Sequence, residues 1–429
     1  MRSAIRERRR VILTRSSGRG PAGGVPRTWF ITSPLVIRPP RPVPVSWLTS
    51  AAIAQQAPQG VSETSLTTDA AQANDPSHRD WPVPRGDAES TGFTPESLAD
   101  DLQVRWQFTA DEAIETTPVV ADGRVYISDM MGHLYALSEQ DGKEIWRREY
   151  DTIFSASPAV HGDLLVIGDV DGNLYGIDAV KGTELWKQTT EGEISGAAAF
   201  HKTNVLITSW DGSLYCFAGQ DGAPLWKYET GDQVRCSPTL AGDRTFLGGC
   251  DGQLHIVDLN TGKSVGEPLP LGGPTGSTPA VRGDHAFLPI MDGVVFAFDW
   301  KERKELWQHE DPQRPQEYQS SAAVSKELVV VSSQFRKVDA ISAQTGKLKW
   351  RHTLKRRADA SPVIAGSDVW IASTDGRLIR LSVADGTERW SYEIRGAFLA
   401  SPAIASGRLY IADDKGVVHC FGPAADANR

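Results

Sequence analysis

The chain has 429 residues, enough for a sizeable hydrophobic core, and a formal net charge of −9. The charge is uneven, because residues 1–50 hold ten Arg and one Glu whereas the remainder holds 35 basic and 53 acidic side chains, a difference of −18. An acidic body of this kind excludes a general nucleic-acid-binding protein.

The first 80 residues differ in composition from the rest of the chain. They contain no run of 18 apolar residues, so no transmembrane helix is predicted. The stretch from Pro44 to Ala57 has a short apolar core and an A-x-A motif ending at Ala54, which resembles the end of a secretory signal peptide. A mis-assigned start codon or an Arg-rich organelle transit peptide would also account for the segment.

We therefore expect residues 1–54 to form a basic leader and the protein to be exported, in the periplasm or cell envelope of a bacterium. Residues 55–80 are rich in Gln, Ser, Thr, Ala and Asp and hold few large apolar side chains. This composition predicts a flexible linker ahead of the folded body.

From residue 81 onward the chain repeats a unit of about 40 residues. The unit "DGNLYGIDAVKGTELW", which ends at Trp186, has copies that end at Trp146 and Trp226. Each copy consists of short alternating apolar segments separated by Gly, Asp and Asn, a pattern typical of antiparallel β-hairpins. Four such strands per repeat predict one blade of a β-propeller.

Two marker positions count the blades. A Ser/Thr position, usually followed by Pro, falls at Thr117, Ser157, Ala197, Ser237, Thr278, Ser321, Ser361 and Ser401. A Trp position falls at Trp106, Trp146, Trp186, Trp226, Gly266, Trp307, Trp350 and Trp390. The last repeat lacks its fourth strand, and the segment from Leu102 to Thr109 is a fourth strand with no repeat before it. The sequence therefore predicts an all-β, eight-bladed propeller over residues 81–423, closed by this N-terminal strand, with a tail over residues 424–429.

The recurring tryptophans indicate structure and not ligand stacking, because a binding site rarely needs the same residue in every unit. We expect them to dock neighbouring blades. The glycines of the Asp-Gly and Thr-Gly turns would let the backbone approach the indole rings closely.

The repeat "LYGIDAVKGTELW" resembles that of the pyrroloquinoline quinone (PQQ)-like β-propellers. This superfamily includes quinoprotein alcohol dehydrogenases and the outer-membrane assembly scaffold BamB. The resemblance implies the eight-bladed fold, and it leaves function open because one fold hosts many functions.

The resemblance to the quinoprotein dehydrogenases implies PQQ and Ca²⁺ held by carboxylates, long insertions on one face and often an adjacent cysteine pair. Here the blade spacing is nearly uniform and no Cys-Cys occurs, so we expect no cofactor and no catalytic residue. No metal-binding motif is found among the nine His. The four cysteines are expected to be small buried side chains, with a Cys236–Cys250 disulfide left open. No cysteine precedes Cys216, so a lipid anchor is not supported.

Irregular repeats indicate where a partner would bind. The loops before blades five, six and seven, "LGGPTGS", "EDPQRPQEYQS" and "LKRRADA", lie on one face by the topology of a four-stranded meander, as does the turn "SQFRK". The predicted partner surface comprises Tyr318, Gln319, Gln334, Phe335, Arg336, Arg356 and Arg357. An aromatic and arginine patch on an acidic body is typical of a protein-binding surface, and drift of decayed repeats is the alternative.

The preferred function is a non-catalytic, BamB-like interaction scaffold of the cell envelope, monomeric, with an envelope protein as partner. A PQQ-dependent alcohol dehydrogenase is the enzymatic alternative. A carbohydrate or small-ligand binding module that uses the central channel is the third hypothesis.

Overall fold

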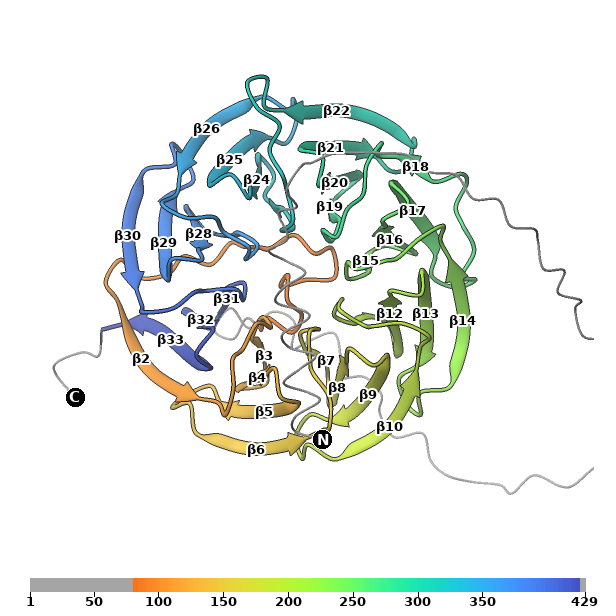
Figure 1. The fold of residues 1–429 in the computed structure, drawn as a ribbon, viewed down its shortest axis with the longest axis vertical. Coiled ribbons are helices and arrows are strands. Elements are labelled where there is room, and N and C mark those ends of the chain that lie inside the picture. Colours follow the sequence, from red (N-terminus) through yellow and green to blue (C-terminus); the bar gives the residue numbers. More distant parts are fainter. Residues whose placement is uncertain (1–79, 425–429) are drawn as a thin grey trace, which may run out of the picture. The chain divides into compact units, whose positions relative to one another are not determined.

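The computed structural model describes residues 80–424, within a compact unit that spans Pro76–Arg429. These residues form eight four-stranded sheets arranged in a ring (Figure 1), so the predicted all-β, eight-bladed propeller is confirmed. The predicted leader, nearly all of the predicted linker and all but the first residue of the tail lie outside the described residues. No helix in residues 80–424 is long and apolar enough to cross a membrane.

The strands of the first four blades run outward from the channel in chain order. Blade 1 holds β3 (Val119–Ala121), β4 (Arg124–Ser128), β5 (His133–Ser138) and β6 (Glu144–Glu149). Blade 2 holds β7 (Ala159–His161), β8 (Leu164–Gly168), β9 (Asn173–Asp178) and β10 (Glu184–Thr189). Blade 3 holds β11 (Ala199–His201), β12 (Asn204–Ser209), β13 (Ser213–Ala218) and β14 (Pro224–Glu229). Blade 4 holds β15 (Thr239–Ala241), β16 (Arg244–Gly248), β17 (Gln253–Asp258) and β18 (Leu269–Pro270).

Blades 5 to 7 follow the same order, and blade 8 departs from it in its outermost strand. Blade 5 holds β19 (Ala280–Arg282), β20 (His285–Pro289), β21 (Val294–Asp299) and β22 (Lys304–Glu310). Blade 6 holds β23 (Ala323–Val324), β24 (Leu328–Ser332), β25 (Lys337–Ser342) and β26 (Leu348–Thr353). Blade 7 holds β27 (Val363–Ala365), β28 (Asp368–Ala372), β29 (Arg377–Ser382) and β30 (Glu388–Glu393), with β1 (Phe93–Thr94) parallel to β27. Blade 8 holds β31 (Ala403–Ala405), β32 (Arg408–Ala412), β33 (Val417–Pro423) and β2 (Leu102–Thr109).

The outermost strand of blade 8 comes from the other end of the propeller sequence. β2 pairs antiparallel with β33, from Leu102 opposite Pro423 to Thr109 opposite Val417. The last sheet thus joins residues separated by about 300 positions. Without β2, the outer edge of β33 would have no strand paired with it.

In blades 1, 2 and 8 an aspartate at the start of the turn between the second and third strands holds that turn. In blade 2, Asp169 Oδ1 accepts the N–H groups of Asp171 (3.0 Å) and Asn173 (2.8 Å), while Oδ2 accepts the Tyr175 hydroxyl (2.9 Å). Asp129 and Asp413 hold the equivalent turns of blades 1 and 8 in the same way. The Asp-x-x-Gly pattern shared by these three turns is therefore a turn signature.

Indole rings pack at the junctions between blades. Trp186 of β10 donates its Nε1–H to Gly219 O of blade 3 (2.8 Å) and covers Gly222, where an added Cβ would lie 2.8 Å from the ring. The same bond to the next blade is made by Trp106, Trp146, Trp307 and Trp350. Trp226 of blade 3 covers Gly262 of blade 4. Trp390 of blade 7 packs against Trp370 of its own blade and Phe421 of blade 8.

The one blade that lacks this tryptophan uses an arginine instead. Gly266 stands at the Trp position of blade 4, where β18 is only two residues long. Arg303 of blade 5 reaches across and donates to the carbonyls of Val265 and Glu267. The missing indole is thus replaced by a guanidinium that bonds the backbone just before the shortened strand.

The Ser/Thr positions form a nearly continuous hydrogen-bonded ring. In seven blades the hydroxyl accepts the backbone N–H of the equivalent residue in the preceding blade, for example Ser157 Oγ from Thr117 (2.9 Å) and Ser401 Oγ from Ser361 (2.9 Å). The ring also closes across the chain ends, because Ser401 donates to Thr117 Oγ1 (3.3 Å). Blade 3 interrupts it, since Ala197 has no hydroxyl to accept the Ser157 N–H.

Replacing Ala197 by serine is expected to complete this ring and to raise the free energy of unfolding by about 0.5–1.5 kcal/mol. Chemical denaturation of the full chain measures the change. Ala197→Val, which adds volume but no acceptor, is the control and should not stabilise. A serine variant that is no more stable than the parent would contradict the expected bond.

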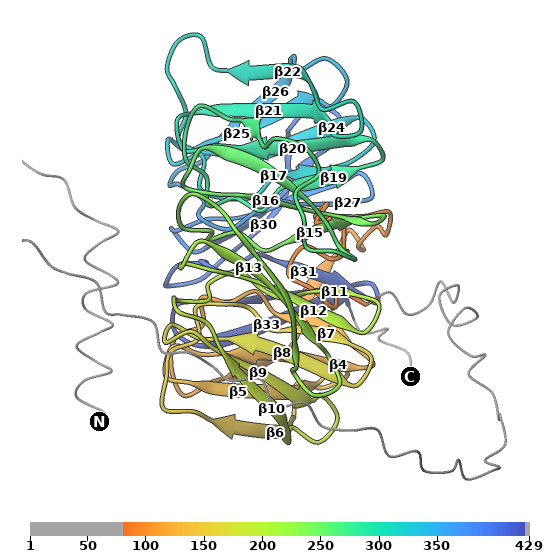
Figure 2. The ribbon, with the colours of Figure 1, turned by 90° about the vertical axis from the view of Figure 1, so that its right-hand side faces the viewer.

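Residues 81–94, here called the strap, cross the channel on one face (orange in Figures 1 and 2). Strap carbonyls accept the N–H of an innermost-strand residue in blades 1, 2, 4, 5, 6 and 7. These donors are Val120, Val160, Leu240, Val281, Val324 and Ile364, at 2.7–2.9 Å. Arg85 of the strap, only 6% exposed, adds two side-chain bonds to the blades by donating to Ala322 O (2.8 Å) and Pro362 O (3.0 Å).

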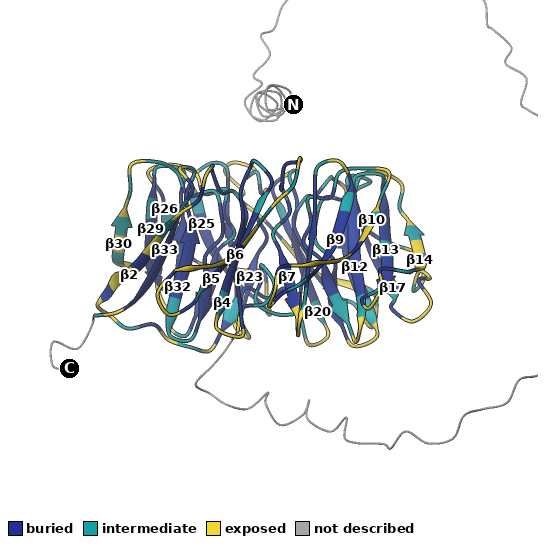
Figure 3. Cartoon of the chain, turned by 90° about the horizontal axis from the view of Figure 1, so that it is seen from below, coloured by how far each residue is buried: buried dark blue, intermediate teal, exposed yellow. Residues whose placement is uncertain are grey.

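Most strand residues are buried (dark blue in Figure 3), and their apolar side chains form clusters between neighbouring blades. One such cluster joins Tyr126 and Trp146 of blade 1 to Leu165, Ile167 and Tyr175 of blade 2. Each sheet buries both faces, because each lies between two others. This explains why the middle strands are almost continuously apolar.

Candidate functional site

The longest loop between two blades lies on the face opposite the strap (Figure 2). It follows β22 and leads to β23. Asp311 organises it by accepting the Gln313 N–H (3.0 Å), the Gln316 Nε2–H (3.1 Å) and the Arg351 Nη1–H (2.6 Å). The Gln313 N–H and the Arg351 guanidinium lower the pKa of Asp311.

Arg351 ties this loop to the rigid sheet below it. Its guanidinium makes a two-point contact with the buried Asp339 carboxylate of β25, at 2.6 and 2.7 Å, in addition to its bond with Asp311. Bidentate Arg–carboxylate pairs are stronger and more directional than single contacts. The loop is therefore anchored to blade 6 by one arginine shared between two acids.

Tyr318 does not belong to the predicted partner surface. Its side chain is 1% exposed and packs with Phe287 and Trp307 beneath the loop. Burial raises its pKa. The physical reason is that Tyr318 occupies the apolar core position found three residues before the Ser/Thr marker, where other blades have Phe154, Ile194 and Phe398. Aligning the repeats at that position would have identified it as a core residue.

The remaining predicted residues lie close together on blades 6 and 7. Gln334 donates its Nε2–H to Asp359 Oδ1 (2.8 Å), and Arg357 donates to the same carboxylate (3.2 Å). The Gln334 N–H also bonds Glu317 O of the long loop (2.8 Å), and Gln319 bonds the Glu317 side chain (2.6 Å). The loop, the inner turn of blade 6 and the loop before blade 7 thus form one connected surface.

Phe335 and Arg336 project from the inner turn of blade 6. Arg314 of the long loop, which sequence analysis missed, places its guanidinium 3.9 Å from the centroid of the Phe335 ring. This cation–π contact leaves Phe335 only partly buried and Arg314 exposed. We define the blade 6–7 surface as Arg314, Gln319, Gln334, Phe335, Arg336, Arg356 and Arg357.

Arg336 adopts a left-handed backbone conformation, with φ of 68°. Blades 1–5, 7 and 8 place a glycine with positive φ at this turn position, for example Gly172 and Gly376. An arginine there costs backbone free energy that glycine avoids. Blade 6 therefore has an exposed arginine at a position where the backbone conformation favours glycine.

The loop before blade 5, Leu271 to Ser277, is less closely connected to this surface. Its Pro274 O accepts the Met291 N–H (3.0 Å), and Thr275 is buried. Ser277 reaches blade 6 through a bond from its hydroxyl to Ser320 O (3.1 Å). This loop packs beside the long loop of blade 6, and it adds no exposed cation to the surface.

The channel is where the third hypothesis places a carbohydrate or small ligand. Its ring of hydroxyls is engaged with backbone N–H groups, and the strap with the buried Arg85 crosses one end. Within residues 80–424 no group of three or more His, Cys, Asp and Glu side chains could hold a metal ion. All four cysteines are free thiols, so Cys236 and Cys250 are not joined.

Comparison with known proteins places the chain in a family. The model of the family described as outer membrane protein assembly factor BamB matches residues 98–179, 130–269 and 268–425. The chain belongs to this family. The predicted PQQ-like β-propeller membership is thereby confirmed, whereas a search of curated proteins found no match.

Solved structures with the same fold include a BamB protein and two dehydrogenases. BamB from Moraxella catarrhalis is 20% identical with a TM-score of 0.66, covering 75% of this chain and 99% of that one. The quinohemoprotein alcohol dehydrogenase from Comamonas testosteroni is 15% identical with a TM-score of 0.70, covering 82% of each chain. A europium-containing methanol dehydrogenase is 11% identical with a TM-score of 0.65, covering 80% and 98%. At these identities the likeness shows the fold alone.

Proposed function

We propose that this member of the BamB family is a non-catalytic protein-interaction scaffold of the cell envelope, and that its partner binds the blade 6–7 surface. The observation that carries the proposal is a group of exposed arginines on blades 6 and 7, in which Arg314 of the anchored long loop contacts Phe335. Arginine and aromatic side chains are enriched among the residues that dominate protein–protein binding energy.

The charge of this surface supports a partner with acidic groups. Arg314, Arg336, Arg356 and Arg357 are exposed on a body whose acidic residues outnumber its basic ones. A basic patch on an acidic protein steers an acidic partner toward one orientation and disfavours others. The family description and the BamB neighbour support an envelope location for the complex.

The backbone conformation of Arg336 gives a second line of support. Unfavourable conformations persist where the residue has a use that outweighs their cost, and they cluster at binding sites. Drift would more readily leave glycine or asparagine at this turn, because both adopt positive φ at lower cost.

Reversing the charge of Arg336, Arg356 and Arg357 together to glutamate is expected to reduce capture of the partner from an envelope extract by about tenfold or more. The matched control reverses Lys304, Lys347 and Lys349, which are exposed on blades 5 and 6 away from this surface. Pull-down with quantitative mass spectrometry measures both. Equal capture by the two triple variants would remove this surface as the binding site.

The enzymatic alternative is tested separately. The full chain is mixed with PQQ and Ca²⁺, and quinone absorbance and dye-linked alcohol oxidation are followed. The scaffold proposal expects neither to change. Saturable quinone binding together with alcohol oxidation would overturn it in favour of a quinoprotein dehydrogenase.

A further inference from the structure

The strap leaves one innermost strand uncovered beside a cavity. It bonds the second residue of the innermost strand in blades 1, 2, 4, 5, 6 and 7, but no described strap carbonyl accepts the Phe200 N–H of blade 3. Phe200 pairs with Val205 in the same register as Val160 pairs with Leu165, so its N–H points to the same free edge. Blade 8 is also passed over, but its equivalent, Ile404, is 1% exposed.

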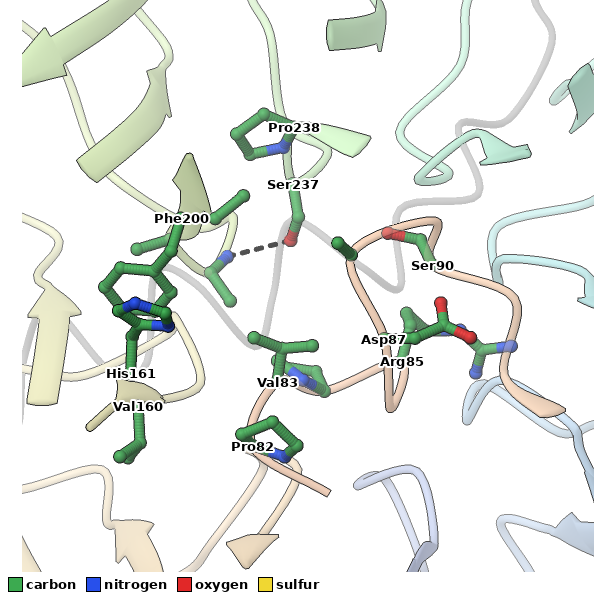
Figure 4. A pocket seen from close by; sticks show the side chains of 15 residues that line it. Pro82, Val83, Arg85, Asp87, Ser90, Val160, His161, Phe200, Ser237 and Pro238 are labelled. Atoms are coloured by element: carbon green, nitrogen blue, oxygen red, sulfur yellow. Dashed lines mark hydrogen bonds between the residues drawn. The ribbon is translucent and has the colours of Figure 1, made fainter. Parts of the chain in front are cut away.

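A cavity of about 140 Å³ adjoins this edge (Figure 4). Its walls are mainly apolar and come from the strap and from blades 2, 3 and 4, including Val83, Val160, Phe200 and Pro238. Figure 4 also shows the bond from the Ala197 N–H to Ser237 Oγ at its rim (2.9 Å). A cavity of this volume accepts one medium-sized apolar side chain.

The cavity follows from a departure of blade 3 from the repeat. Blade 3 reads Ala197-Ala198-Ala199, whereas blade 2 reads Ser157-Pro158-Ala159 and blade 4 reads Ser237-Pro238-Thr239. Loss of the serine hydroxyl and of the proline ring removes side-chain volume at the channel wall. The same residues therefore interrupt the hydroxyl ring and open the space next to Phe200.

A groove between blades 2 and 3 adjoins the cavity across the His161 and Phe200 rings. A second hollow of about 470 Å³ shares His161 and Phe200 with the first and extends outward past Leu185, which is 53% exposed. The His161 and Phe200 rings stack at the junction, with centroids 5.3 Å apart. Asp163 and Asp178 line the outer part, so the apolar groove ends beside carboxylates.

We propose that this groove binds an extended segment of a partner protein, on the face opposite the blade 6–7 surface. A carbonyl of the segment accepts the Phe200 N–H, as strap carbonyls do in six other blades. Its adjacent apolar side chain fills the cavity, and a basic side chain lies near Asp163. The strap is the precedent within the molecule, because the groove continues the interface between the strap and the innermost strands.

The probe is a set of fluorescein-labelled heptapeptides with a central Val, Leu or Phe and a Lys near one end, titrated into the full chain. Fluorescence anisotropy should show saturable binding for some members with a Kd below about 1 mM. Replacing Lys by Glu in a peptide that binds should weaken its affinity for the chain. Absence of binding by every peptide, or indifference to that replacement, would overturn the proposal.

The double variant Ala197→Ser/Ala198→Pro restores the sequence of the other blades and should fill the cavity. We expect it to weaken peptide binding by about tenfold or more while the fold is kept, because it also completes the hydroxyl ring. Ala322→Pro in blade 6, the other blade without this proline, is the matched control and should bind normally. Equal peptide affinity in the double variant and the parent would refute the site.

Hydrogen–deuterium exchange locates the bound peptide. Protection should increase in the fragment that contains Phe200 and not in the one that contains Leu240, whose N–H the strap already occupies. A concentration-dependent dimer in sedimentation that blocks the peptide would show that a second copy occupies the groove, against the proposal. None of these outcomes depends on the blade 6–7 surface, so the two sites can fail separately.

Discussion

Replacing Trp186 by alanine is expected to lower the free energy of unfolding by about 3–5 kcal/mol. The indole is 7% exposed and lies between blades 2 and 3. It donates to Gly219 O and covers Gly222, so its loss leaves both a cavity and a buried carbonyl without its donor. Equilibrium denaturation of the full chain, followed by fluorescence and circular dichroism, measures the change.

Two further variants separate the contributions of packing and hydrogen bonding at this junction. Trp186→Phe keeps much of the apolar contact but loses the donor, and we expect a smaller loss of about 1–3 kcal/mol. Leu225→Ala in β14 is the exposed control, 49% exposed, and should change stability by less than about 0.5 kcal/mol. If Trp186→Ala lost no more free energy of unfolding than Leu225→Ala, this indole would not dock the blades.

Replacing Arg85 by alanine is expected to destabilise the protein by about 2–4 kcal/mol, because it leaves the buried carbonyls of Ala322 and Pro362 without their donor. Burial lowers the pKa of Arg85 to about 10, so the guanidinium remains protonated at neutral pH. Its plane also packs against the strap backbone at Gly92, where an added Cβ would clash with it. The loss should be accompanied by faster proteolysis within residues 81–94.

The control for Arg85 is Arg105→Ala. Arg105 also donates to a backbone carbonyl, that of Pro423 (3.0 Å), but this bond is exposed to solvent. We expect its removal to cost less than about 0.5 kcal/mol, because water replaces the lost partner. If Arg85→Ala matched this control in both stability and proteolysis, the strap would be held without the guanidinium.

Several site features follow from the repeat once its copies are aligned. The exposed positions of Arg336, Arg356 and Arg357 could be predicted, because they fall in loops that depart from a regular pattern. Tyr318 was predicted at the surface because it lies in one of these irregular loops, although its position matches Phe154 and Phe398 in the core. Arg314 was missed because its contact with Phe335 joins a loop to a turn 21 residues further along the chain.

The sequence by itself determined the number of blades, the order of strands within each blade and the residues that recur at their junctions. These follow from alternation and turn chemistry over stretches of about 40 residues, and most strand pairing occurs within such a stretch. Only the tertiary structure decided the path of the strap and the open edge at Phe200. Arg85 meets its partners 237 and 277 positions away, and such contacts depend on the geometry of the closed ring.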